Sequence, residues 1–141
     1  MADLGTLIRL HKHELDEKRL ALAQLYTSME GLEFHRRQLE ENFIKEKELA
    51  KTNGDVNFTF VRYAEQVQRQ REEMDNVKAQ LEKRISDAKD SMMETFSELK
   101  KFEMTQAERD RLAAEERALK ESNEMDEIGL ETFRRKNEEQ A

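Results

Sequence analysis

The chain has no cysteine, no proline and no tryptophan, and only four of its 141 residues are glycine. Without cysteine it can form no disulfide, no thiolate nucleophile and no cysteine-based zinc site. Without proline, and with so little glycine, it lacks the turn residues that sheets and loop-rich domains need. No segment approaches the roughly 20 apolar residues that a membrane-spanning helix requires. These absences argue against a sheet protein and against a conventional pocketed enzyme, and they favour long, continuous helices.

Charge is abundant but balanced along the chain. Charged residues make up 40% of the sequence, with 25 basic and 32 acidic side chains and a formal net charge of −7. There is no basic excess or basic stripe of the kind that nucleic-acid binders carry, and no polybasic cluster for anionic lipid. The first residues also lack the basic segment and apolar run of a secretion signal. We therefore expect a cytoplasmic protein that binds no nucleic acid and does not insert into a membrane.

Two series of positions, each with members spaced seven residues apart, run through the first third of the chain. Ten of their 14 positions are apolar. Such a repeat is typical of the seam of a coiled coil. The first series is Ile8, Leu15, Leu22, Met29, Arg36, Phe43 and Ala50, and the second is Leu4, His11, Lys18, Leu25, Leu32, Leu39 and Glu46.

A second pair of series follows, and ten of its 13 positions are apolar. It ends after Phe102, where polar residues take over the same positions. Its members are Phe60, Val67, Met74, Leu81, Ala88, Thr95 and Phe102, together with Ala64, Arg71, Lys78, Ile85, Met92 and Leu99.

Between the two seams, Asn53-Gly54 provides the one turn signal, because both residues tolerate a left-handed backbone. We predict an all-α fold of one domain, a long two-helix antiparallel coiled-coil hairpin with helices over about 3–51 and 58–136 and a bend at 52–57. In this arrangement Leu4 lies opposite a residue close to Met104. Polar seam residues should lower stability and fix the register; these are His11, Lys18, Arg36, Arg71 and Lys78.

Residues 105–141 then overhang the first helix. They carry a weaker apolar pattern that has no partner within the chain, and an apolar face of this kind is a candidate docking surface. Its members are Leu112, Leu119, Met125, Ile128, Leu130 and Phe133.

No catalytic, cofactor-binding or metal-binding motif is present. His11 and His13 point about 160° apart on a helix and cannot share a metal ion. Adjacent acidic residues are expected on solvated faces, where nothing would perturb their pKa values. We therefore expect a protein that is not an enzyme and needs no cofactor.

Several segments resemble the FliJ family, the soluble stalk component of the flagellar type III protein export apparatus. They are the opening LGTLIRLHKHELDEKR at 4–19, FVRYAEQV at 60–67, KKFE at 100–103 and MDEI at 125–128. Their order along the chain carries most of the resemblance.

The resemblance implies a non-enzymatic coupling protein for bacterial flagellum biogenesis. Such a protein would be associated peripherally with the inner-membrane export apparatus and monomeric when free. It implies binding to the hexameric export ATPase, to the cytoplasmic domain of the export gate and to export chaperones. By analogy, the open end of the hairpin and the overhang would enter the ATPase ring. The end near the bend would face the gate, with Leu39, Phe43, Phe60, Tyr63 and Val67 as candidate contacts. Phe43, Phe60 and Val67 could equally be buried seam residues, whereas Tyr63 lies off the seam.

Two other interpretations remain open. One is the equivalent stalk of a virulence-type injectisome, which the sequence separates poorly from a flagellar stalk. The other is a generic dimeric coiled-coil scaffold with a parallel seam.

Overall fold

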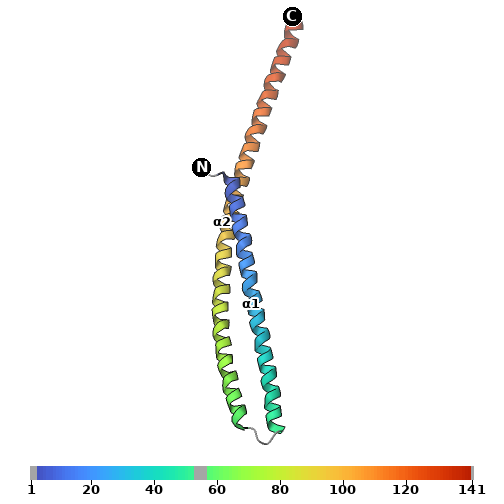
Figure 1. The fold of residues 1–141 in the computed structure, drawn as a ribbon. Helices are drawn as coiled ribbons and strands as arrows, with labels where there is room; N and C mark the ends of the chain where they lie inside the picture. The colour runs from blue at the N-terminus through green and yellow to red at the C-terminus, as the bar shows by residue number, and fades with distance from the viewer. Residues whose placement is uncertain (1–2, 53–56, 141) are drawn as a thin grey trace. The chain divides into compact units, whose positions relative to one another are not determined.

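A computed structural model describes residues 3–52 and 57–140, and within these ranges the chain forms two α-helices (Figure 1). Helix α1 spans Leu4–Thr52 and helix α2 spans Asn57–Gln140. The expected helices, 3–51 and 58–136, differ from these bounds by one to four residues. The predicted turn at Asn53-Gly54 lies outside the described residues. The fold is an all-α two-helix hairpin, as the two seams predicted.

The described residues fall into two units. One consists of residues 12–96, and the other combines residues up to 11 with those from 97 onward. Each unit contains a piece of both helices.

In the unit of residues 12–96, α1 and α2 run in opposite directions (Figure 1). Lys18 Nζ donates to the hydroxyl of Thr95 at 2.6 Å, and Arg36 Nη1 donates to the carboxylate of Asp75 at 2.8 Å. Later residues of α1 therefore meet earlier residues of α2, which is the antiparallel register expected from a fold-back at 52–57. Nearer the bend, Phe43 stacks on Phe60.

The core of this unit is narrow and follows the predicted seams. Leu15 is 4% exposed and Val67 only 1%. Of the 27 predicted seam positions in both units, only Glu46 and Lys78 are exposed. Neither helix has more than a narrow apolar stripe, so each depends on the other helix for its stability. The other buried side chains of this unit are Leu22, Leu81, Ile85 and Thr95.

In the second unit, residues of α1 before Lys12 pack against α2 from residue 97 onward. The ring of His11 lies 4.9 Å from that of Phe102, and His11 Nε2 lies 3.3 Å from the carboxylate of Glu98. Leu99 is buried. Gln106 is still half-buried, whereas Met104 is 71% exposed. The packed face thus extends one seam position beyond Phe102, to Gln106. Every residue from 107 to 140 is exposed.

No helix in the described ranges contains a stretch that is both long and apolar enough to cross a membrane.

Candidate partner-binding surfaces

An aromatic cluster lies at the end of the 12–96 unit nearest the bend. The Phe43 ring comes from α1, and its centroid is 5.9 Å from that of Phe60 and 6.3 Å from that of Tyr63, both in α2. Both ring pairs are stacked. All three side chains are half-buried, so the cluster packs the two helices together and remains partly accessible to solvent.

An ion-pair network joins the helices next to this cluster. Arg71 Nε and Nη2 donate to the two carboxylate oxygens of Glu40, each at 2.7 Å, and the Arg71 guanidinium also lies 4.8 Å from the centre of the Phe43 ring. Hydrogen bonding from Arg71 lowers the pKa of Glu40 and raises the pKa of Arg71 itself. A two-pronged arginine–carboxylate pair fixes geometry better than a single contact does. The network therefore sets the register of the helices at this level.

The five residues predicted to contact the export gate are placed differently from one another. Phe43, Phe60 and Tyr63 come together in the aromatic cluster. Leu39, four residues before Phe43 in α1, is half-buried. Val67 is 1% exposed and packs in the core, so its side chain offers no surface to a partner in the closed hairpin. A gate contact by any of the five stays a prediction.

Four exposed apolar residues flank the bend and were not predicted as contacts. Phe58 is 77% exposed, Leu49 56%, Ile44 55% and Val61 50%. Arg62 lies with its guanidinium 5.3 Å from the centre of the Phe58 ring. All four lie outside the seven-residue series. The sequence could have indicated these contacts, because a large apolar residue that lies off the seam of a highly charged helix is expected to be exposed.

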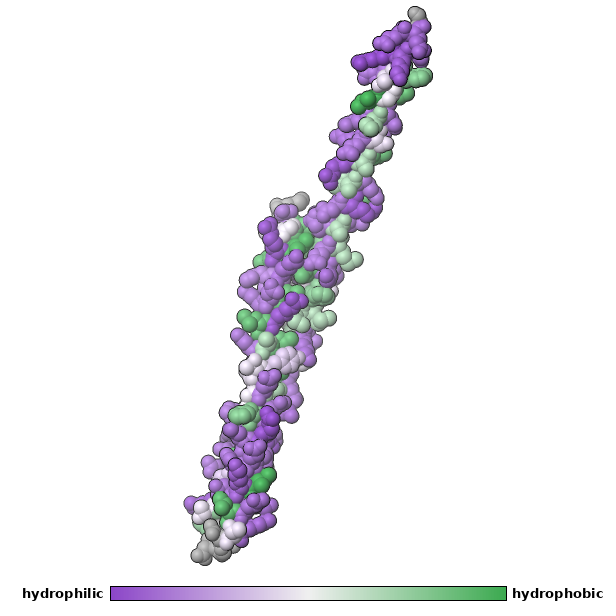
Figure 2. Space-filling view, turned by 90° about the vertical axis from the view of Figure 1, so that its right-hand side faces the viewer, coloured by the Kyte–Doolittle hydropathy of each residue, from purple (hydrophilic) through white to green (hydrophobic). Residues whose placement is uncertain are grey.

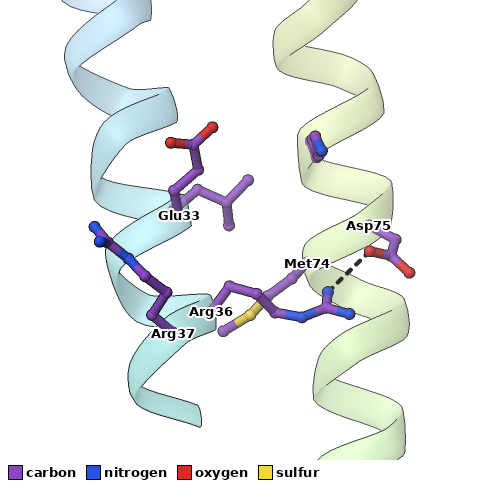
Figure 3. A pocket seen from close by; sticks show the side chains of 7 residues that line it. Glu33, Arg36, Arg37, Met74 and Asp75 are labelled. Carbon is purple, nitrogen blue, oxygen red and sulfur yellow. Dashed lines mark hydrogen bonds and ion pairs between the residues drawn. The ribbon is translucent and has the colours of Figure 1, made fainter. Parts of the chain in front are cut away.

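An open groove of about 520 Å³ lies between the helices halfway along the same unit (Figure 3). Leu32 and Met74 form its apolar part, while Arg36 reaches across to Asp75. The groove exists because two seam positions at this level, Arg36 and Lys78, carry charged side chains whose ends stay near water. Because Lys78 is exposed, little apolar volume fills the space between the helices here.

The overhang was predicted to begin at residue 105, and the fully exposed part of α2 begins two residues later; this exposed helix, residues 107–140, is here called the tail. Its six apolar candidates are between 51% (Leu112) and 71% (Met125) exposed. Figure 2 shows apolar side chains at intervals along the tail among hydrophilic ones. Leu119 and Ile128 are nine residues apart, or two and a half turns, so they lie on opposite sides of the helix. The tail therefore exposes apolar side chains on two faces. Besides Leu112 and Met125, the six candidates include Leu119, Ile128, Leu130 and Phe133.

Intrahelical ion pairs line the tail. Arg111 bonds both Glu108 and Glu115, and Arg135 bonds Glu131 at 3.2 Å. Hydrogen bonding from Arg111 lowers the pKa of Glu108. Pairs three and four residues apart support a helix that lacks a packing partner.

The histidines occupy the positions that the helical spacing predicted. The side chain of His11 is 14% exposed in the packed face, and that of His13 is 72% exposed beside Glu17. Among the described residues, no three histidine, cysteine, aspartate or glutamate side chains are grouped so that they could hold a metal ion.

The fold and these surfaces define a two-helix coiled-coil hairpin with a single-helix tail. Comparison with protein-family models, with curated proteins and with solved structures found no match for the chain.

Proposed function

We propose that the chain is a non-enzymatic stalk and coupling component of a flagellar type III protein export apparatus. In this role it binds the hexameric export ATPase through the tail, and the cytoplasmic domain of the export gate through the end of the hairpin near the bend. Export chaperones are further partners, and the protein acts in the cytoplasm at the inner-membrane export apparatus. The proposal joins the resemblance in sequence to the form of the tail.

The observation that carries the proposal is the distribution of apolar side chains on the tail. A flat partner would contact one face of a helix and leave the other wet. A ring that surrounds the helix contacts every face, and Leu119 and Ile128 lie on opposite faces. Exposed apolar residues on both faces therefore suit the lumen of a ring better than a flat surface.

The surface near the bend suits a second, separate partner. Phe58 and Val61 are exposed there, and the half-buried aromatic cluster adds its accessible part to them. Tyrosine is favourable at such a site because its ring contacts the partner while its hydroxyl stays hydrated. The two surfaces lie at opposite ends of α2 in the sequence, so one chain could bind the ATPase and the gate at once.

The test uses the purified export ATPase of the same organism with the full chain added below one copy per ring. We expect the ATPase to bind the chain and to hydrolyse ATP faster. Replacing apolar residues on either face of the tail, as Leu119→Gln with Leu130→Gln or as Met125→Gln with Ile128→Gln, should reduce the stimulation. Glutamine keeps the helix propensity close to that of leucine and methionine.

Truncation after Met104 separates the two surfaces. The shortened chain should lose binding to the ATPase and keep binding to the gate domain. An ATPase that neither binds the full chain nor accelerates with it would contradict the proposed function.

The injectisome stalk remains the alternative with the same mechanism, and the genes beside the coding sequence would distinguish it. The scaffold with a parallel seam is less favoured, because intrachain contacts such as Arg71–Glu40 and Lys18–Thr95 already cover the seam within one molecule.

A further inference from the structure

One face of the tail has the spacing of a coiled-coil seam. Seven positions follow one another at alternate steps of four and three residues, which is the step pattern of a heptad repeat. Four of the seven are apolar, and all four are at least 51% exposed. These positions, here called the tail seam, are Leu112, Glu116, Leu119, Asn123, Asp126, Leu130 and Phe133. Glu116, Asn123 and Leu130 continue the seven-residue series that ends the hairpin at Phe102, whereas the other four positions are shifted by one residue from the second series of the hairpin seam.

We propose that the tail seam pairs with the tail seam of a second copy of the chain, in antiparallel orientation, with the two-fold axis beside Asn123. This proposal concerns the free protein and does not rest on the proposed function. It adds that self-pairing and ATPase binding would use the same face and exclude each other.

The polar members of the tail seam decide the orientation. In a parallel pair, Glu116 would meet Glu116 of the second copy and Asp126 would meet Asp126, so like charges would lie together in the interface. An antiparallel pair centred on Asn123 separates both of these couples. It places Leu112 level with Phe133 of the second copy and brings the two Asn123 amides together, where each can donate and accept a hydrogen bond. A single buried asparagine pair commonly fixes the register of a coiled coil.

The charges that flank the tail seam agree with this orientation. In an antiparallel pair, Lys120 lies level with Glu127 of the second copy, and the two-fold axis creates this opposite-charge couple twice. Both side chains are exposed, and neither takes part in an ion pair within the part of the chain that the structure describes. In a parallel pair, Lys120 would instead flank Glu115, which already bonds Arg111.

The interface is short, so the pairing should be weak and should depend on concentration. It spans about three heptads, near the lower limit for a stable pair of helices in water. Three of its seven positions are polar. We expect monomers in dilute solution and dimers at high concentration.

The first test is sedimentation equilibrium of the full chain, without any ATPase, between about 5 and 500 µM, the range in which a weak helix pair would form. The mass should rise from 16.8 kDa toward twice that value. The double variant Leu119→Gln with Leu130→Gln should raise the dimer dissociation constant at least about tenfold, because each dimer loses four apolar contacts.

The matched control is Met125→Gln with Ile128→Gln, which makes the same kind of change in the same segment. Ile128 lies opposite Leu119 on the helix, so this variant should dimerise like the original chain while losing stimulation of the ATPase. A chain that stays monomeric at every concentration, or a dimer that both double variants weaken equally, would overturn the pairing and leave the proposed function standing.

The second test is a charge exchange that fixes the orientation. Lys120→Glu and Glu127→Lys should each weaken the dimer several-fold, and the two together should restore it, because the exchanged charges still meet across the axis. In a parallel pair the combined variant would stay weak, since the carboxylate introduced by Lys120→Glu would then flank Glu115. Failure to restore the dimer, with helix content unchanged by circular dichroism, would exclude the antiparallel arrangement.

Discussion

Helix α2 contains two stretches with similar residue types and very different surroundings. Up to Gln106 its seam residues pack against α1, and Val67 and Leu99 are 1% and 4% exposed. From residue 107 to residue 140 every side chain is exposed, although leucine, isoleucine, methionine and phenylalanine all continue to occur. Apolar content alone therefore does not make a core. The paired stretch keeps its buried apolar residues in one phase, whereas the tail divides its apolar residues between two faces.

The phase determines which face can be covered within one chain. In the paired stretch, the seven-residue period keeps the same face toward α1 for about six heptads. In the tail, Met125 and Ile128 leave that period, so a single neighbouring helix could cover only part of the apolar surface. The rest of the apolar surface of the tail could be buried by binding to other molecules.

The largest expected difference between the two stretches is in their contribution to stability. Leu22→Ala should lower the free energy of unfolding by about 2–3 kcal/mol, because Leu22 is 9% exposed and its removal leaves a cavity. The same change at Leu119, which is 64% exposed, should alter it by less than about 0.5 kcal/mol. Urea unfolding followed by circular dichroism at low protein concentration checks both. Equal losses at the two positions would mean that the tail is packed in solution.

Ion pairs in the paired stretch should also contribute more to the free energy of unfolding than ion pairs in the tail, but the difference should be smaller than for the leucines. Glu40→Gln removes one partner of the pair with Arg71 across the helices and should cost about 1 kcal/mol or less, because the side chain of Glu40 is 36% exposed and solvent screens the pair. Glu108→Gln removes an intrahelical pair on the fully exposed tail, and we expect no measurable change in the unfolding of the hairpin.

The Glu40 contribution also predicts a pH dependence. Since the folded state lowers the pKa of Glu40, its contribution is complete above the ordinary glutamate pKa of 4.5 and is lost as the pH falls through the lowered value. Acid titration of the original chain and of Glu40→Gln should give stabilities that converge at low pH. Curves that stay parallel through this range would show that Glu40 does not contribute in this way.

Much of this arrangement could be predicted from the sequence, because the seven-residue period translates directly into a buried face. Every side chain that is fully buried in the described residues lies at a predicted seam position, and of the 27 seam positions only Glu46 and Lys78 are exposed. Some half-buried residues off the seams, such as Glu40 and Tyr63, were not identified. Periodicity could not identify Glu40 as the partner of Arg71, because Glu40 lies beside the seam and reaches Arg71 through its side-chain conformation. It also gave no reason to separate Val67, a core residue, from Phe43, whose ring remains partly accessible.

Two glycines lie within the helices away from their ends, and replacing them should distinguish the paired stretch from the tail by a small gain in stability rather than a loss. Nothing lies within 4 Å of a Cβ added at Gly31 in α1 or at Gly129 in the tail, so alanine fits at both positions without a clash. Gly31→Ala should raise the free energy of unfolding of the hairpin by up to about 1 kcal/mol, because alanine restricts the unfolded chain and favours the helix. Gly129→Ala should instead let the tail keep its helix content to a higher temperature. The main unfolding midpoint should stay unchanged, since the tail adds no packing to the hairpin. Circular dichroism measured across a temperature ramp separates the two responses. A Gly129→Ala variant that shifted the main transition as far as Gly31→Ala does would show that the tail and the hairpin unfold as one cooperative unit.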